Sequence, residues 1–165
     1  MIDNLLIRKC CLSDLESLLG LQQSVYSALP DKNQLRLNTA TMLADCLQPP
    51  HTCLGVFADG LVAAAILFVP TDESEDIAHT INLTQRAANL KLVMVDNRYR
   101  GLGIQQKLMN MLEQEAVEQH FEVLCCTCSP DNKFSINNIE LCGYRLAATM
   151  EKYGGLKRNI YYKFI

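Results

Sequence analysis

The six residues from Arg100 to Gln105, Arg-Gly-Leu-Gly-Ile-Gln, have the types and spacing of a turn that binds phosphate groups. An aliphatic run, Leu92–Val95, precedes them and helically spaced apolar residues follow, which indicates a strand before the turn and a helix after it. Glycines at such a turn leave main-chain N–H groups uncovered where the helix dipole is positive. The arginine adds a charge-assisted donor. The segment therefore predicts a site for a ligand that carries a pyrophosphate.

Two common phosphate-binding loops are excluded by the residues that follow Gly103. A Walker loop ends in Gly-Lys-Ser or Gly-Lys-Thr, but here Ile104 and Gln105 come next. The dinucleotide fingerprint needs a third glycine where this chain has Gln106, and no acidic residue ends a second strand at the expected distance. The turn therefore belongs to another kind of site.

The stretch from Val95 to Ile104 resembles the coenzyme A-binding signature of the GNAT superfamily of acyl-CoA N-acyltransferases. That signature has Gln or Arg, two further residues, Gly, one more residue, and then Gly or Ala. Arg100 and Gly103 match the pattern, whereas Gln105 stands where a small residue is usual. A side chain there could point away from the ligand, because the main-chain N–H is the donor.

A second stretch supports the same resemblance from outside the turn. Asn132 is followed eleven residues later by Gly143-Tyr144, which is similar to the family's Asn, short helix and Gly-aromatic segment. The specific similarity lies within residues 92–144, and before that only the order of elements agrees. The resemblance implies a single GNAT-like acyltransferase domain over residues 1–165.

The resemblance also implies acetyl-CoA as the co-substrate and coenzyme A as the released product. In this family the signature strand splays away from the next strand, and pantetheine fills the gap like an added strand. By position, Met94 and Val95 would supply the main-chain contacts. Asn132 would contact the cofactor from the other side, although its position equally suits a helix N-cap. The pyrophosphate would be cradled by Arg100, Gly101, Leu102, Gly103, Ile104 and Gln105.

The implied reaction is direct transfer of an acetyl group to an amine of a small molecule or peptide. The backbone N–H of Val95 could stabilise the oxyanion. The position of the family's frequent tyrosine acid is Ile139 here, and the signature strand carries no carboxylate that could act as a base. A non-catalytic acyl-CoA-binding or regulatory module on the same fold is therefore the alternative.

Several side chains could supply a proton donor or a base, and the sequence does not choose among them. Besides water, the candidate donors are Tyr99, Tyr144, Tyr153, Tyr161, Tyr162 and Ser129. The candidate bases are His79, Glu75 and Asp76. The acidic run at residues 72–76 is expected to be a mobile, solvated loop, and it slightly favours a cationic acceptor.

The cysteines are expected to be small buried hydrophobic residues. The chain has eight of them, without the spacing of a disulfide framework, which favours a reducing compartment. A zinc site at Cys125, Cys126, Cys128 and His120 is disfavoured, because neighbouring strand residues point to opposite faces. A Cys–His nucleophile, with His120 beside Cys126 or Cys128, is disfavoured because a catalytic thiol needs an electropositive, partly exposed setting. No metal is expected.

Composition bounds the remaining function classes. With 165 residues, 49% hydrophobic and 20% charged, the chain is long and apolar enough for one globular domain. Its net charge of −3 gives no basic surplus for nucleic acid. The longest apolar stretch, 61–70, is too short to cross a bilayer, and Met1–Asn4 shows no secretory pattern. We therefore expect a cytoplasmic protein without a membrane or nucleic-acid partner, and a homodimer is possible.

The pattern of elements predicts an α/β (α+β) fold of the GNAT type. Its central sheet would be mixed but mostly antiparallel, with about six to seven strands and about four flanking helices. Asp59-Gly60 marks a hairpin, and Ser13–Glu16 reads as a capping box that starts the first helix. The expected strands are residues 5–9, 53–58, 61–69, 90–95, 122–128, 144–150 and 159–164. The expected helices begin near residues 13, 39, 104 and 132.

Overall fold

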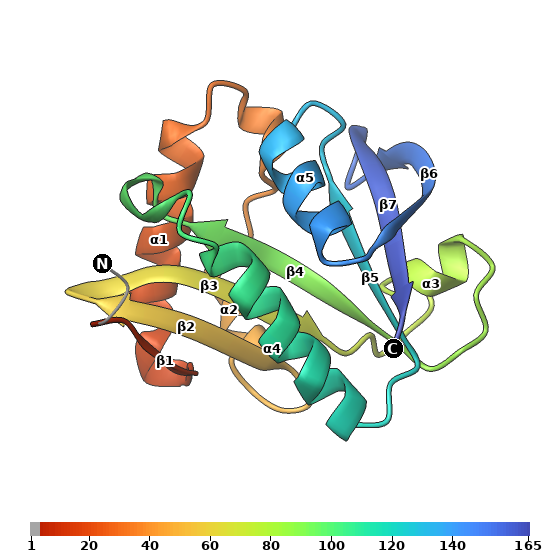
Figure 1. Cartoon of the computed structure of the whole chain (residues 1–165), viewed down its shortest axis with the longest axis horizontal. Helices are drawn as coiled ribbons and strands as arrows, with labels where there is room; N and C mark the ends of the chain where they lie inside the picture. The colour runs from red at the N-terminus through yellow and green to blue at the C-terminus, as the bar shows by residue number, and fades with distance from the viewer. Residues whose placement is uncertain (1–3) are drawn as a thin grey trace.

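The computed structural model describes residues 4–165, and these form a seven-stranded sheet with the order β1-β2-β3-β4-β5-β7-β6 (Figure 1). The first three residues, which entered the argument about a secretory signal, lie outside the described residues. Neighbouring strands are antiparallel except for β4 and β5. The predicted mixed, mostly antiparallel sheet is confirmed. The strands are β1 Leu6–Lys9, β2 Thr52–Ala58, β3 Gly60–Phe68, β4 Ala87–Val95, β5 Val123–Cys128, β6 Arg145–Lys152 and β7 Leu156–Phe164.

Within the described part of the chain, five α-helices flank the sheet, one more than the sequence predicted. α1 and α2 pack on one face, and α4 and α5 pack on the other (Figure 1). The additional helix is the short α3, which lies in the segment before β4. Across residues 4–165, no helix is both long enough and apolar enough to cross a membrane. The helices are α1 Leu15–Ala28, α2 Ala40–Cys46, α3 Ile77–Thr80, α4 Ile104–Glu118 and α5 Lys133–Leu141.

The strand β3 explains why part of the sequence is uniformly apolar. Its odd-numbered residues between 63 and 67 pack in the same core cluster as α4, whereas residues 64 and 66 pack with α1 and α2. Successive side chains of a strand point to opposite faces, so a strand covered on both faces has no polar positions. This strand, which is covered on both faces, is the neighbour with which β4 pairs.

One predicted turn is confirmed, and the first helix begins within two residues of its predicted start but with a different capping box. The hairpin at Asp59-Gly60 joins β2 to β3 as expected. The capping box forms between Cys11 and Asp14 rather than over Ser13–Glu16, at the start of a 3-10 turn that precedes α1. The Asp14 carboxylate accepts hydrogen bonds from Cys11 N–H (2.9 Å) and from the Arg8 guanidinium (2.8 and 2.9 Å). The first strand therefore anchors the start of the first helix.

The strand β4 begins three residues earlier than predicted and has two unlike halves. Its first half, Ala87–Leu90, pairs in parallel with β5, and this ladder ends where Leu90 lies opposite Cys126. Its second half continues to Val95, paired with β3 on its other edge. From Leu90 onward β4 and β5 diverge (Figure 1). The second half of β4 is therefore a free strand edge in the middle of the sheet, as the resemblance implied.

Candidate active site

The free edge of β4 presents main-chain groups to the gap between β4 and β5. Asp96 N–H donates to the Val62 carbonyl (2.9 Å), so Val95 and Ala63 form a non-hydrogen-bonded pair of the antiparallel ladder. The N–H and C=O of Val95 therefore point away from β3 and into the gap. The same alternation turns the main-chain groups of Met94 to β3. Of these two predicted main-chain partners, the geometry favours Val95.

A bulge shapes β4 just before this free edge. The register against β3 shifts between Ala64 and Ile66, whose partners on β4 are Met94 and Lys91. One extra residue is therefore inserted into β4. Leu92, within the insertion, has a φ of 48°, which is unusual for a branched side chain. Bulges increase strand twist and redirect side chains, and backbone strain of this kind tends to occur at functional sites.

The turn after β4, residues 100–105, has the conformation that phosphate binding requires. Gly101 and Gly103 have φ values of 76° and 73°, and a Cβ at either position would meet nothing within 4 Å. Glycine is therefore needed for the backbone conformation rather than for space. The first hydrogen bond of α4 runs from Lys107 N–H to the Gly103 carbonyl (3.0 Å). The N–H groups of residues 103–106 consequently have no partner inside the helix, at its positive end.

Of the arginines at this turn, Arg100 is the one available to a phosphate. Its guanidinium is exposed and lies over the Phe134 ring, 5.8 Å from the centroid. Arg98 instead pairs with Asp96 (3.0 Å), and this contact lowers the pKa of the Asp96 carboxyl. A cation at a helix N-terminus is disfavoured by the dipole, so a bound anion would relieve an existing repulsion at Arg100.

The side chain of Gln105, which departs from the family pattern, ties two helices together. Its amide oxygen accepts from Asn138 Nδ2 (3.1 Å), and Gln106 Nε2 donates to Asn138 Oδ1 (2.9 Å). The Gln105 side chain therefore reaches to α5 while its main-chain N–H stays at the turn. Asn132 caps α5 by accepting from Ser135 N–H (3.1 Å). The capping interpretation of Asn132 is confirmed, and its amide nitrogen is the group left for a cofactor.

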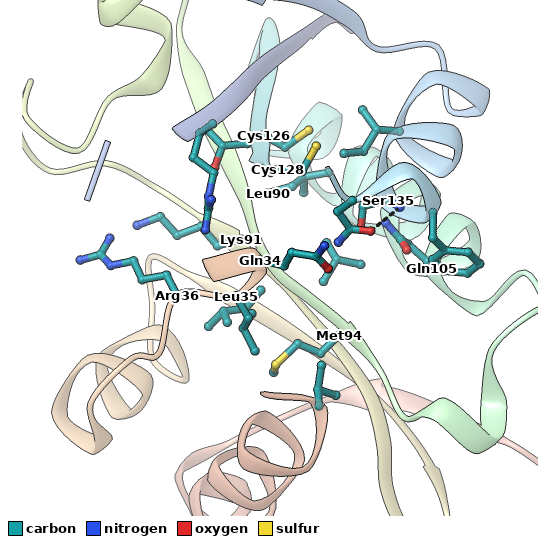
Figure 2. A pocket seen from close by; sticks show the side chains of 18 of the residues that line it. Gln34, Leu35, Arg36, Leu90, Lys91, Met94, Gln105, Cys126, Cys128 and Ser135 are labelled. Atoms are coloured by element: carbon teal, nitrogen blue, oxygen red, sulfur yellow. Dashed lines mark hydrogen bonds between the residues drawn. The ribbon is translucent and has the colours of Figure 1, made fainter. Parts of the chain in front are cut away.

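A cavity of about 410 Å³ extends along the free edge of β4. Its wall comes from β4, the ends of α1 and β5, the start of α5 and the segment at residues 34–38. Figure 2 shows Lys91 and Arg36 on one side of it and Gln105 and Ser135 on the other. Five of the nine predicted cofactor residues line it, namely Met94, Val95, Arg100, Gln105 and Asn132. The other four, Gly101, Leu102, Gly103 and Ile104, form the turn beside it.

Among the candidate proton donors, Tyr153 is the one that lines the cavity in the described structure. Its hydroxyl is 3.4 Å from Thr127 Oγ1. Tyr144 and Tyr161 are buried elsewhere, and burial raises the pKa of both. Ile139, which stands at the position of the family's frequent tyrosine acid, forms part of the apolar wall of the cavity. The remaining candidates, Tyr99, Tyr162 and Ser129, are not among the lining residues.

The candidate bases are all away from the cavity wall. His79 is exposed and 3.6 Å from Glu73, Asp76 caps α3 through Ala78 N–H, and Glu75 binds Thr71. The sequence missed a set of basic residues that does line the wall, formed by Arg36, Lys91 and Arg158. They come from three distant segments, so spacing gave no signal. A lysine inside an aliphatic strand was the one available hint.

The cysteines are free thiols, and seven of the eight are buried. Cys126 and Cys128 line the cavity, but burial raises the pKa of both thiols, that of Cys128 to about 11. His120 precedes β5, whereas these cysteines lie near the end of that strand. The geometry gives no support to a Cys–His nucleophile. Within residues 4–165, no group of three or more His, Cys, Asp or Glu side chains is placed to hold a metal ion.

A family model supports this geometry with sequence evidence. Residues 15–144 match the Acetyltransferase (GNAT) family, and the chain belongs to this family. Members of the family use acetyl-CoA, so acetyl-CoA is the co-substrate and acetyl transfer is the reaction class. The free β4 edge and the glycine turn fit this molecule, because they offer main-chain groups to pantetheine and N–H groups to the pyrophosphate. Among curated proteins, no sequence matches this chain.

Solved structures show the same fold at low sequence identity. The ribosomal-protein-S18-alanine N-acetyltransferase of Escherichia coli superposes with a TM-score of 0.74 at 19% identity, covering 98% of this chain and 94% of its own. A ribosomal-protein-alanine N-acetyltransferase of Brucella melitensis gives 0.73 at 24%, with 97% and 99% covered. The yncA protein of Salmonella typhimurium, solved with its cofactor acetyl-CoA, gives 0.71 at 17%, with 98% and 94% covered. The predicted GNAT fold is confirmed.

Proposed function

We propose that the protein transfers the acetyl group of acetyl-CoA directly to an amine. The observation that carries this proposal is the continuity of the free β4 edge. At one end it runs into the 100–105 turn, and along its length it forms one wall of the cavity. A linear molecule with a pyrophosphate at one end and a thioester at the other can therefore follow β4 from the surface into the cavity.

Within this proposal, the main chain holds the thioester and polarises it. When bound, acetyl-CoA supplies the thioester that is attacked. The C=O of Val95 is placed to pair with a pantetheine amide, and its N–H is placed to donate to the thioester oxygen as negative charge develops there. The N–H groups of residues 103–106 and the Arg100 guanidinium hold the pyrophosphate.

Tyr153 is the proposed proton donor. The amine nitrogen forms a bond to the carbonyl carbon while the carbon–sulfur bond breaks, the departing thiolate takes the phenolic proton, and the nitrogen releases its surplus proton to solvent to give the neutral amide. Solvent then restores that proton. The cations at Arg36, Lys91 and Arg158 disfavour a protonated amine beside them, so the acceptor would lose its own proton to solvent before attack.

The proposed function is tested by following free thiol release from acetyl-CoA with a panel of amines, and by detecting the acetylated amine by mass. Melting curves with acetyl-CoA run in parallel, because a ligand at a hundredfold its Kd stabilises a fold by about 2.7 kcal/mol. Thiol release with product formation supports the enzyme. A melting shift without product for any amine would instead support a non-catalytic acyl-CoA-binding or regulatory module.

Three further expectations remain proposals. We infer one acyltransferase domain over residues 1–165 and a cytoplasmic location. We also infer that a homodimer would form through the edge of the sheet, where β6 carries exposed apolar side chains such as Leu146. Size-exclusion chromatography with light scattering checks the dimer, and an elution mass of one chain would overturn it.

A further inference from the structure

We propose that the amine acceptor also carries an anionic group, a carboxylate or a phosphate, held by Arg36, Lys91 and Arg158. All three residues line the cavity, with Lys91 and Arg36 on the same side of it (Figure 2), and we call the part of the cavity that these three residues line the acceptor end. The inference rests on the proposed function, because it names the chemical class of the acceptor. It places a small zwitterionic amine, such as an amino acid, in the cavity.

The acceptor end is separate from the part that takes the pyrophosphate. Lys91 lies four positions before Val95 on the far side of the bulge, and the 100–105 turn comes after Val95. Figure 2 shows the Lys91 and Arg36 side chains extending to the side opposite Gln105. A phosphate at the turn cannot also neutralise these cations, so their charge is available to another ligand.

The burial and contacts of Arg158 give the strongest support for an anion-binding acceptor end. Its side chain is 4% exposed, and its guanidinium donates only to main-chain carbonyls within the described structure, those of Asn33 (2.6 Å) and Lys157 (2.9 Å). Burial lowers its pKa, which means that the charged form is held there at some expense of stability. A buried charge usually has an oppositely charged partner, and an anionic ligand would supply one here.

Lys91 and Arg36 are supported by aromatic rings rather than by carboxylates. The Lys91 ammonium lies 3.5 Å from the centroid of Phe68, and the Arg36 guanidinium lies 4.3 Å from that of Tyr153. Rings stabilise a cation without using its hydrogen-bond donors. Neither residue forms an ion pair within residues 4–165, so their donors remain free to bind an anion.

The carboxylates near the acceptor end do not cancel its charge. Glu75 lies near Lys91 but accepts from the N–H and hydroxyl of Thr71. Asp31 lies near Arg158 but caps a 3-10 turn through Asn33 N–H. Neither lines the cavity, and the lining carboxylate, Asp131, stands beside Asn132 at the other end. The acidic run at residues 72–76 therefore does not prepare this cavity for a cationic acceptor.

Matched ligand pairs test the proposal. Glycine, β-alanine and γ-aminobutyrate are compared with their neutral amides, phosphoethanolamine with ethanolamine, and 1,3-diaminopropane serves as the cationic amine. We expect kcat/KM to be at least tenfold higher for one anionic amine than for its neutral partner. Equal rates within every pair, or a preference for the diamine, would overturn the proposal. Comparison of the amino acid pairs with the phosphoethanolamine pair shows whether the site binds a carboxylate or a phosphate.

Variants assign the effect to the acceptor end. Arg36→Met should raise KM at least tenfold more for the anionic amine than for its neutral partner, because only the anionic amine loses an ionic contact, and the fold should survive because Arg36 is half-buried and outside the sheet. Arg145→Met, an exposed cation on β6, is the matched control and should change neither. Arg158→Met should have a larger effect, with folding checked by its melting curve. An Arg36→Met enzyme with an unchanged KM for the anionic amine would refute the assignment.

A binding readout separates this inference from the proposed function. In the presence of coenzyme A, N-acetylglycine should raise the melting temperature more than N-acetylglycinamide, and Arg36→Met should abolish the difference. This measurement needs no turnover. If no amine is acetylated but the difference is present, the proposed function fails and the anion site stands. If amines are acetylated but neither N-acetylglycine nor a phosphorylated analogue is favoured, the anion site fails alone.

Discussion

The two ends of the cavity are formed by different kinds of chemical group. The cofactor end uses main-chain groups, namely the free edge of β4 and the N–H groups at the start of α4, within one continuous stretch of chain. The acceptor end uses three charged side chains, Arg36, Lys91 and Arg158, from segments far apart in the sequence. A main-chain site depends on conformation and tolerates many side chains, whereas a side-chain cluster depends on each residue type. The two ends should therefore respond differently to substitution.

The two largest effects are expected where the acetyl group is transferred, and the first of them comes from removing a main-chain donor at the cofactor end. Val95→Pro deletes the N–H that faces the gap but no bond to β3, so the strand pairing should survive. We expect kcat to fall about 10² to 10³-fold, as for loss of an oxyanion donor. Steady-state kinetics with circular dichroism measure this. A rise in KM for acetyl-CoA with kcat unchanged would instead place Val95 N–H on pantetheine.

Tyr153→Phe tests the boundary between the two ends. If the phenol protonates the leaving thiolate, kcat should fall about 10² to 10⁴-fold, the usual range for a general acid. The ring remains, so the stacking of Arg36 and the KM of the amine should be retained. The pH profile of kcat separates chemistry from packing. A variant that keeps both kcat and the alkaline limb of the wild-type profile would exclude Tyr153 as the donor.

Gly103→Ala probes conformation at the cofactor end without removing any group. The left-handed backbone there costs a residue with Cβ about 1–2 kcal/mol, so acetyl-CoA should bind about tenfold more weakly. The matched control is Gly20→Ala in the middle of α1, where helix propensity should stabilise the fold by about 0.5–1 kcal/mol. Calorimetric titration and melting curves measure both. Equal acetyl-CoA affinities in the two variants would contradict the role assigned to the turn.

The smallest effect is a pH dependence confined to the acceptor end. Burial lowers the pKa of Lys91, with Arg36 and Lys152 acting in the same direction and Cys46 and Glu75 opposing it. An anion needs the protonated form, so N-acetylglycine should bind several-fold more weakly as pH rises from about 7 to about 10, below the ordinary lysine value. Lys91→Met should bind weakly and lose this slope, and acetyl-CoA binding should lack it in both proteins. If Lys91→Met kept the same pH dependence of N-acetylglycine binding, a group other than Lys91 would be responsible for it.

The cofactor end could be predicted from sequence because its information is local. Glycine positions, the strand before them and the helix after them are adjacent in the chain, and the backbone they specify is itself the proposed binding surface. The same locality explains the correct hairpin at Asp59-Gly60 and the correct cap at Asn132. The misplaced capping box of the first helix has the opposite cause. There Asp14 is held by Arg8 on a neighbouring strand, and a local capping pattern contains no such partner.

The acceptor end could not be predicted because tertiary structure assembles it. Arg36 lies in an irregular segment, Lys91 in the bulged strand and Arg158 in a strand that pairs across the sheet. Nothing in the spacing of these residues indicates that they meet. The acidic run at 72–76 was the visible charge pattern, but none of its residues lines the cavity. The sequence likewise could not choose among the candidate proton donors, whereas the structure shows that Tyr153 lines the cavity.

The bulged second half of β4 bears on how this protein avoids aggregation. A strand with one bare edge is normally a place where another chain can add itself, and proteins cover or charge such edges. Here the bare edge lies inside the sheet, flanked by β5 and the start of α5 rather than at the border. A slender linear ligand can enter this opening, whereas the side chains of another polypeptide strand would clash with β5 and the start of α5. The fold thus keeps an unpaired strand edge available to a slender ligand and shields it from edge-to-edge pairing with another strand.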